Sequence, residues 1–157
     1  MEDGCLSGAG RSALLLIGGL VMNETKGFEH WTLSFDDGID PLSEKTIVSG
    51  RIPFPFEIIE MKFEFRKGCE TLLEYKVFAS DNNIAPSSGE PPGINVLSGY
   101  GQRDYIAAED AIISIYHTFR VEHPGWYVKL YVNNRDIFEH TVGAWITLRI
   151  LSKGVIA

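Results

Sequence analysis

The sequence lacks the features that mark several large classes of protein. Its 157 residues include only two cysteines, Cys5 and Cys69, whose separation matches no metal-binding or redox motif. The sequence leaves open whether the two thiols pair, and it favours two free thiols. Basic residues are also few, since 14 Lys and Arg face 21 Asp and Glu and the formal net charge is −7. An acidic chain does not attract nucleic acid, so we expect no nucleic-acid partner.

Long hydrophobic runs are missing too. The apolar stretch 13–17 resumes at 20–22 after two glycines, and together the two parts fall short of the ~20 residues that span a bilayer. The chain begins Met-Glu-Asp, without the basic start of a signal peptide. We therefore expect no membrane partner and no export signal, and synthesis in a cytoplasm.

Catalytic and metal-binding motifs are absent as well. The chain has no GxSxG, no P-loop and no GxGxxG after a strand, and its four histidines form no HxH or HxxxH pair. The acidic stretch Asp36–Asp40 has carboxylates that suit a hard cation, but it lacks the spacing and the closing glutamate of an EF-hand loop. A solvated turn is favoured there, and cation binding stays open. We expect a non-enzymatic protein without a metal or cofactor.

What the sequence does contain is alternation of apolar and polar residues with a period of two, which is typical of half-buried strands. Residues 57–66 and 71–79 alternate in this way around a Lys-Gly break, which predicts a hairpin. Their predicted inward residues are Ile59, Met61, Phe63 and Phe65, then Leu73, Tyr75, Val77 and Ala79.

Further strands are expected along the rest of the chain. The stronger ones are at 112–121, 126–132 and 142–150, and the weaker ones are at 30–35, 45–51 and 94–97. Residues 14–22 suit a strand or a helix, and the one short helical candidate, 107–111, could equally be a turn. Many short strands separated by turns predict an all-β fold, an antiparallel two-sheet β-sandwich of jelly-roll type.

The predicted domain organisation has two parts. Residues 1–28 are expected to form an extended N-terminal arm that contacts neighbouring subunits, because residues 1–12 are small, polar and rich in glycine. Residues 29–157 are expected to form the sandwich domain, with a long ordered loop at 80–103 that reaches across a surface. The connection after residue 132 is too long for a tight turn and contains the apolar pair Ile137-Phe138, so it is expected to cross between the sheets.

Large aromatic side chains fall on the faces of strands that should be solvated. Tyr127 and Tyr131 lie opposite the core face of one predicted strand, and Trp145 and Arg149 opposite that of another. Tyr, Trp and Arg are enriched at interface hot spots, and aromatic rings also suit stacking on sugars. The predicted interface residues are Tyr100, Tyr116, Tyr127, Tyr131, Trp145 and Arg149. A covering loop or the N-terminal arm would explain the rings equally well.

Two stretches of the chain resemble jelly-roll structural proteins of tailed-phage virions. The segment SGRIPFPFEIIEMKFEFRKGCETLLEYKVFAS (49–80) resembles their opening strands, in which a Pro-containing segment leads to a strand of the type I-x-x-M-x-F. The segments EHPGWYVKLYVNN (122–134) and HTVGAWITLRI (140–150) resemble their closing pair, with Gly143-Ala144 before a last strand that contains Leu148-Arg149.

This resemblance implies a structural module of a virion. The first expectation is a decoration (cement) protein at the capsid surface that binds the major capsid protein, stabilises the head and assembles as a homotrimer. The alternative is a carbohydrate- or receptor-binding sandwich of a tail fibre or cell-surface protein, with Tyr127, Tyr131 or Trp145 stacking on a glycan.

Overall fold

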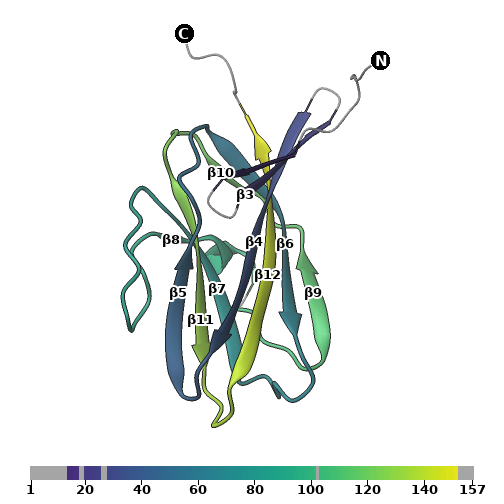
Figure 1. Ribbon diagram of the computed structural model, residues 1–157, viewed down its shortest axis with the longest axis vertical. Coiled ribbons are helices and arrows are strands. Elements are labelled where there is room, and N and C mark those ends of the chain that lie inside the picture. The colour runs from purple at the N-terminus through teal and green to yellow at the C-terminus, as the bar shows by residue number, and fades with distance from the viewer. Residues whose placement is uncertain (1–13, 18–19, 26–27, 102, 152–157) are drawn as a thin grey trace.

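The computed structural model describes residues 14–17, 20–25, 28–101 and 103–151, with side chains from residue 29 onward. Apart from one 3₁₀ turn at Val96–Gly99, the regular elements in these ranges are β-strands, arranged in two antiparallel sheets (Figure 1). The predictions of an all-β class and of an antiparallel two-sheet sandwich are thus confirmed. No helix in the described ranges is long and apolar enough to cross a membrane.

The larger sheet has the strand order β10-β6-β12-β4-β3-β2, and β9 also pairs with β6. Its strands are β2 (Leu14–Ile17), β3 (Leu20–Thr25), β4 (Phe28–Ile39), β6 (Phe56–Phe65), β9 (Ala111–Ile115), β10 (Phe119–Val121) and β12 (His140–Ile150). The smaller sheet has the order β5-β11-β7-β8. Its strands are β5 (Ser43–Val48), β7 (Leu73–Ser80), β8 (Ile94–Asn95) and β11 (Tyr127–Asn134).

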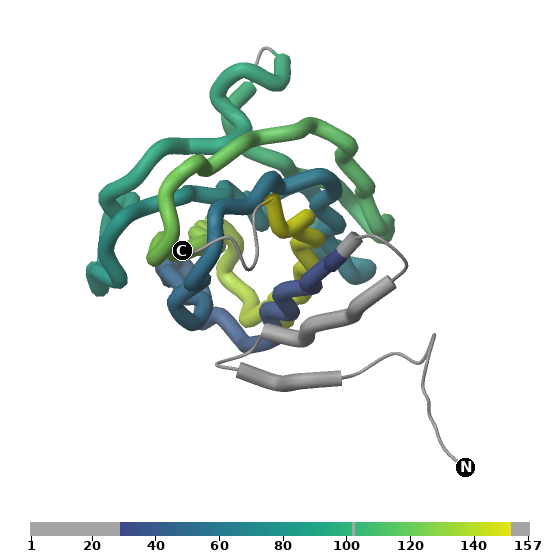
Figure 2. Tube along the Cα trace, turned by 90° about the horizontal axis from the view of Figure 1, so that it is seen from above, coloured from purple at the N-terminus to yellow at the C-terminus, as the bar shows by residue number. Residues whose placement is uncertain are grey.

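The strand pairs are nested in the sequence. β4 pairs with β12, β5 with β11, β6 with β9 and β10, and β7 with β8. The chain therefore crosses to the other sheet at most of its connections. Seen from above in Figure 2, it winds around a central region, which the inward side chains of both sheets fill.

The predicted hairpin between residues 57–66 and 71–79 is wrong, because β6 and β7 belong to different sheets. Both strands were correctly given an apolar inward face, but those faces meet across the core. The ring of Tyr75 on β7 lies 5.4 Å from that of Phe63 and 5.1 Å from that of Phe65, both on β6. By contrast, the prediction that the connection after residue 132 crosses between sheets is confirmed, since β11 and β12 also lie in different sheets.

A bulge in β6 changes which residues enter the core. Pairing with β12 shifts by one residue, so that Thr147 lies opposite Glu60 while Leu148 lies opposite Ile58. An extra residue in one strand reverses the alternation beyond it. Ile58 is therefore buried and Ile59 only half-buried, which corrects the predicted inward position of Ile59.

Several other boundaries differ from the predictions. Strand 112–121 is interrupted, giving β9 and β10, and β4 extends to Ile39, so most of Asp36–Asp40 is strand rather than turn. Residues 107–111 form no helix. In the stretch 14–22, which suited a strand or a helix, residues 14–17 lie in β2 and 20–22 in β3, and these strands extend the larger sheet beyond β4. The rest of the expected arm, residues 1–13, 18–19 and 26–27, lies outside the described residues, and so does Cys5.

Candidate functional site

The predicted interface residues do not form one surface. Tyr127 and Tyr131 belong to β11 in the smaller sheet, whereas Trp145 and Arg149 belong to β12 in the larger sheet. Their exposure also differs. Tyr116 is 73% exposed and Tyr100 is 48% exposed, Tyr131 is buried, and the other three are half-buried.

Tyr131 is covered by its own chain, which agrees with the alternative that a covering loop explains the outward aromatic rings. Its hydroxyl donates a hydrogen bond to the carboxylate of Glu44, and its ring packs edge-on against Phe78 at 6.5 Å. The same carboxylate accepts a bond from the backbone N–H of Gly89 in the long loop. Burial is the main cause that raises the pKa of Tyr131. This tyrosine is therefore not available to a partner.

The long loop is anchored to the outer side of the smaller sheet by a buried lysine. Lys129 of β11 is fully buried, and its Nζ donates to Asn82 Oδ1 at 2.9 Å and to the carbonyl of Pro92 at 3.0 Å. Burial lowers the pKa of this amine. A second tie is the ion pair between Lys76 and Glu90, at 2.5 Å. These contacts hold Asn82, Glu90 and Pro92 of the long loop against β7 and β11.

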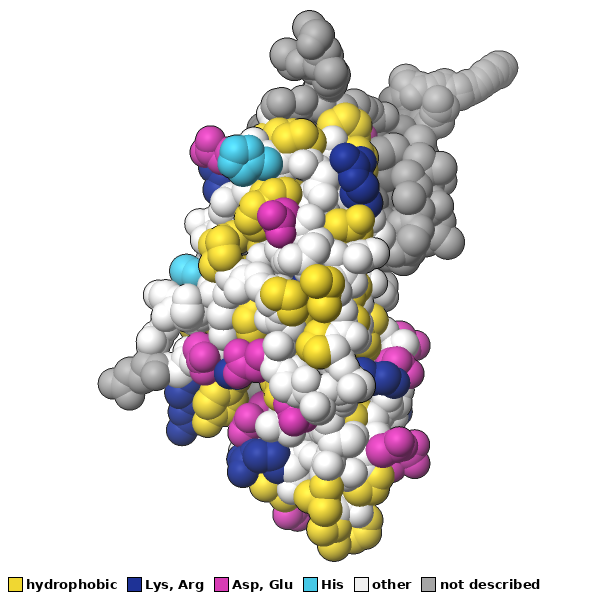
Figure 3. Space-filling model, turned by 90° about the vertical axis from the view of Figure 1, so that its left-hand side faces the viewer, with side chains coloured by type: hydrophobic (Ala, Val, Ile, Leu, Met, Phe, Trp, Pro, Cys, Tyr) yellow, Lys and Arg dark blue, Asp and Glu magenta, His cyan; other side chains and the backbone are white. Residues whose placement is uncertain are grey.

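A cluster of exposed apolar side chains lies at the lower end of the sandwich, on the β4–β5 and β11–β12 connections (Figure 1). Leu42, Ile137 and Phe138 are 68%, 67% and 65% exposed. The two connections touch, because the N–H of Leu42 donates to the carbonyl of Asp136 at 3.0 Å. Hydrophobic atoms are visible at the lower end of the molecule in Figure 3. We call Leu42, Ile137 and Phe138 the apolar tip.

One buried amide fixes the shape of the apolar tip. Asn134 is fully buried, and its Nδ2 donates to the carbonyls of Asp40 at 3.1 Å and Phe138 at 2.8 Å. Its Oδ1 accepts from the N–H of Asp136 at 3.0 Å. The carboxylate of Asp136 in turn accepts from the N–H of Ile137 at 2.7 Å. The loops are thus held in place by buried polar groups while their apolar side chains point into solvent.

Leu42 also has an unfavourable backbone conformation. Its φ is +52°, in the left-handed region, which costs a residue with a branched side chain about 1–2 kcal/mol. Glycine would avoid this cost, and an exposed leucine gains little from burial in the folded chain. Neither local conformation nor core packing explains a leucine at this position.

The surroundings of the apolar tip are acidic. Asp40 and Glu139 flank it, both exposed, and neither forms an ion pair within the described part of the chain. The nearby cations are already used, since Lys45 pairs with Asp37 at 2.8 Å and Arg135 pairs with a glutamate of β7 at 2.9 Å. A partner that fits this end would offer an apolar hollow with a basic rim.

The structure also brings together a cysteine, a histidine and an aspartate that the sequence search missed. His140 Nε2 lies 2.9 Å from Asp136 Oδ2, and its Nδ1 lies 3.9 Å from Cys69 Sγ. The order resembles that of a nucleophile, a base and an orienting acid. However, Cys69 is fully buried, and burial raises the pKa of its thiol, whereas a reactive cysteine needs access and a thiolate. The three side chains therefore serve to brace the lower loops.

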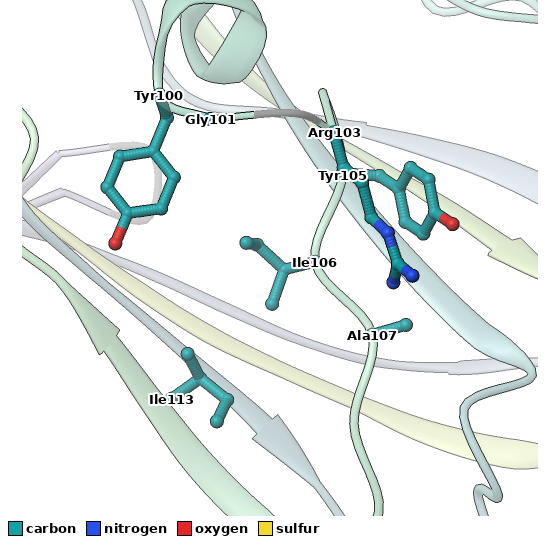
Figure 4. Close-up of a pocket in the computed structure, with 7 residues that line it drawn as sticks. All are labelled: Tyr100, Gly101, Arg103, Tyr105, Ile106, Ala107 and Ile113. Carbon is teal, nitrogen blue, oxygen red and sulfur yellow. The ribbon is translucent and has the colours of Figure 1, made fainter.

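Beside β9 lies a hollow of about 380 Å³, which Figure 4 shows. Tyr100, Ile106 and Ile113 point toward its middle, while the guanidinium of Arg103 lies 5.6 Å from the ring centre of Tyr105. Gly101 and Ala107 complete the lining. The walls are mainly apolar and aromatic, so this region of the surface can take up an apolar or aromatic group.

A second hollow, of about 450 Å³, lies on the outer face of the larger sheet. It is lined by Thr32, Glu60, Lys62, Ile112, Trp145 and Thr147. An indole ring beside hydroxyl and charged groups can stack on a sugar ring and bond its hydroxyls. Arg149, farther along β12, is paired with Glu57 and does not line this hollow.

The described residues contain no group of three or more His, Cys, Asp or Glu side chains placed to hold a metal ion. In the acidic stretch, Asp37 pairs with Lys45, and this hydrogen bond is the main cause that lowers the pKa of the carboxyl. The carbonyl of Asp40 accepts bonds from Ser43 and Asn134.

Comparisons with models of known protein families and with curated proteins give no match to this sequence. Function is therefore inferred from the fold and from the surfaces described above.

Proposed function

We propose that this chain is a non-enzymatic structural protein of a virion, a decoration protein that binds the outside of a phage head and stabilises it. The observation that carries the proposal is the apolar tip, in which Leu42, Ile137 and Phe138 are held out into solvent by the buried side chain of Asn134. The proposed partner is the major capsid protein, which would present an apolar hollow with a basic rim.

The strand order supports the proposal. Nested pairing of β4 with β12, β5 with β11, β6 with β10 and β7 with β8 is the order expected of a jelly roll, in which one long hairpin is wound into two sheets. Jelly rolls serve as capsid and lectin domains, so the fold by itself does not choose between these roles. In this proposal, residues 1–28 form the arm that reaches neighbouring subunits, and β2 and β3 are the part of it that joins the larger sheet.

The apolar tip can supply a useful binding energy. Complete burial of a Leu, Ile or Phe side chain stabilises by about 1.5–3 kcal/mol, and each tip residue has about two thirds of its surface left to bury. The three together therefore offer roughly 3–6 kcal/mol per copy. Because the buried hydrogen bonds already order the loops, little of this energy is lost to ordering them on binding. Many copies on a symmetric shell would add their effects.

Reconstitution on heads tests the proposal. Heads of the phage whose genome encodes this chain would be prepared without it, the purified protein added back, and bound protein measured by sedimentation together with the melting temperature of the heads. We expect the wild type to bind and to raise that temperature. Ile137→Lys should lower the affinity at least about tenfold, since it loses apolar burial and buries a charge. Ile84→Lys, at a loop isoleucine that is 54% exposed, is the matched control and should bind normally.

Two results would contradict the proposal. If the wild type does not bind the heads, the decoration function is wrong. If Ile137→Lys binds as well as the wild type, the tip is not the contact.

A second candidate function is carbohydrate binding, which the hollow around Trp145 favours. In that case a glycan array would show specific binding that Trp145→Ala abolishes, with the fold retained. Tyr131, one of the rings expected to stack on sugar, is buried and takes no part. An array without signal, together with head binding, would leave the decoration function alone.

A further inference from the structure

β9 is an edge strand of the larger sheet without the protection that edge strands normally have. It pairs with β6 on one side, and no strand of the described chain pairs with its other side. In Figure 1 it is the outermost element on the right. Natural edges are usually shielded by charges, prolines or bulges, because their free N–H and C=O groups recruit other strands. Residues 111–116, AIISIY, contain no charge and no proline.

Of the three exposed side chains in residues 111–116, two are apolar or aromatic and the third is the uncharged Ser114. Ile112 is 61% exposed and Tyr116 is 73% exposed. On the other face, Ile113 is half-buried and Ile115 is buried against the core. An uncharged β-strand with free main-chain groups and exposed apolar side chains is a surface that another strand would cover.

From this edge we infer that the protein forms a dimer in which β9 pairs antiparallel with β9 of a second copy. A twofold axis at Ile113 uses the whole strand, placing Ala111 opposite Ile115 and Ile112 opposite Ser114. Each pair joins residues of the same face, as the pleat requires, so the two larger sheets become one continuous sheet. The free N–H and C=O groups of both edges then find partners.

The self-complementary register identifies a second copy as the occupant, because the strand pairs with itself about the twofold axis along its whole length. Each chain carries a net charge of −7, which opposes association, and an uncharged strand is where this repulsion is least. In this register no two like charges face each other between residues 111 and 115. The same register places Asp110 of one copy opposite the uncharged Tyr116 of the other. The inferred dimer does not depend on the proposed decoration function. It differs from the homotrimer that the resemblance implies.

The mass in solution tests this inference. Sedimentation over a range of concentrations should show the purified protein approaching twice its 17.5 kDa. Ile112→Lys with Ser114→Lys places charges next to each other across the axis and should leave only the monomer, with the β-sheet circular dichroism spectrum retained. Its melting temperature should be lower than that of the dimer, because association stabilises the folded state. Ile137→Lys is the matched control, because it changes an isoleucine of similar exposure, 67%, at the apolar tip, and it should still dimerise.

Hydrogen exchange gives a second readout that needs no variant. The outward amides of β9 should be protected at high concentration and should lose that protection on dilution, whereas the amides of β12 in the middle of the sheet should not change. A wild type that stays monomeric at all concentrations would overturn the inference. So would a mass of three subunits, or a dimer that survives both lysines.

Discussion

Replacing Tyr75 by phenylalanine would test the contact that joins the two sheets in the core. Tyr75 of β7 is fully buried, and its hydroxyl donates to the carbonyl of Glu64 at 3.1 Å and accepts from the N–H of Gly143 at 3.1 Å. One hydroxyl of the smaller sheet therefore bonds to β6 and β12 of the larger sheet. Tyr75→Phe keeps the ring that packs on Phe63 and removes only these two bonds.

The structure sets the expected size of the effect. The N–H of Gly143 would be left buried without this partner, which costs about 1–3 kcal/mol, and the lost bond to Glu64 adds about 0.5–1.5 kcal/mol. We expect the variant to be less stable by about 2–4 kcal/mol. For a chain of this length that corresponds to a melting temperature roughly 5–15 °C lower.

The same hydroxyl gives a signature in alkaline solution. Burial raises the pKa of Tyr75 to about 12, from about 10 for an ordinary tyrosine. A raised pKa means that the folded state keeps a proton that the unfolded state releases. The resulting stabilisation is complete below pH 10 and is lost as pH rises through about 12, a change of about 3 kcal/mol. Tyr75→Phe cannot show this loss, so its stability should approach that of the wild type between pH 10 and 12.

Urea unfolding at pH 7 and at intervals from pH 9 to 12 would measure both effects. Tyr116→Phe is the control, because Tyr116 is 73% exposed and its hydroxyl should matter little to folding. The reasoning would be refuted if Tyr75→Phe were as stable as the wild type at pH 7, or if the gap between them stayed constant up to pH 12.

Three further changes have clear expected outcomes. Lys129→Ala should speed hydrogen exchange in loop residues 81–93 while the sheet amides stay protected, because it removes the two bonds that anchor the loop. Leu42→Gly should leave the free energy of unfolding equal or raise it by up to about 1 kcal/mol, since glycine removes the left-handed strain. A large fall in the melting temperature measured by calorimetry would contradict this. Asp136→Asn should reduce stability at neutral pH and flatten its acid dependence. The hydrogen bond from His140 is the main cause that lowers the pKa of Asp136. The stabilisation that this carboxylate gives the fold is therefore present at neutral pH and lost as pH falls through its folded-state pKa. Urea unfolding at a series of acidic pH values would measure this loss in the wild type and its absence in the variant.

Much of the sandwich follows from the sequence because the faces of a strand are a local property. Alternation with a period of two placed Tyr75 and Val77 of β7, Leu130 of β11 and Ile146 of β12 in the core, where the structure has them. The length of the connection after residue 132 and its apolar pair Ile137-Phe138 predicted a crossing between the sheets, which the topology confirms. Where a strand contains a bulge, as β6 does at Ile59, alternation alone gives the wrong face.

The candidate surfaces depended on contacts between distant residues. Tyr131 has the sequence pattern of an exposed aromatic, but Glu44 and the long loop cover it. Ile137 and Phe138 stand out as apolar residues in a polar connection, whereas the role of Leu42 depends on its φ and on its contact with the other loop.

The sequence by itself determined that this protein is built of strands, and it gave most of the inward-facing residues and most of the turns, because each of these depends mainly on neighbours within a few positions. The tertiary structure decided which strands pair, which loops meet at the apolar tip and which edge, β9, is left open. Those outcomes depend on residues far apart in the chain whose hydrogen bonds and packing form only when the two sheets close on each other.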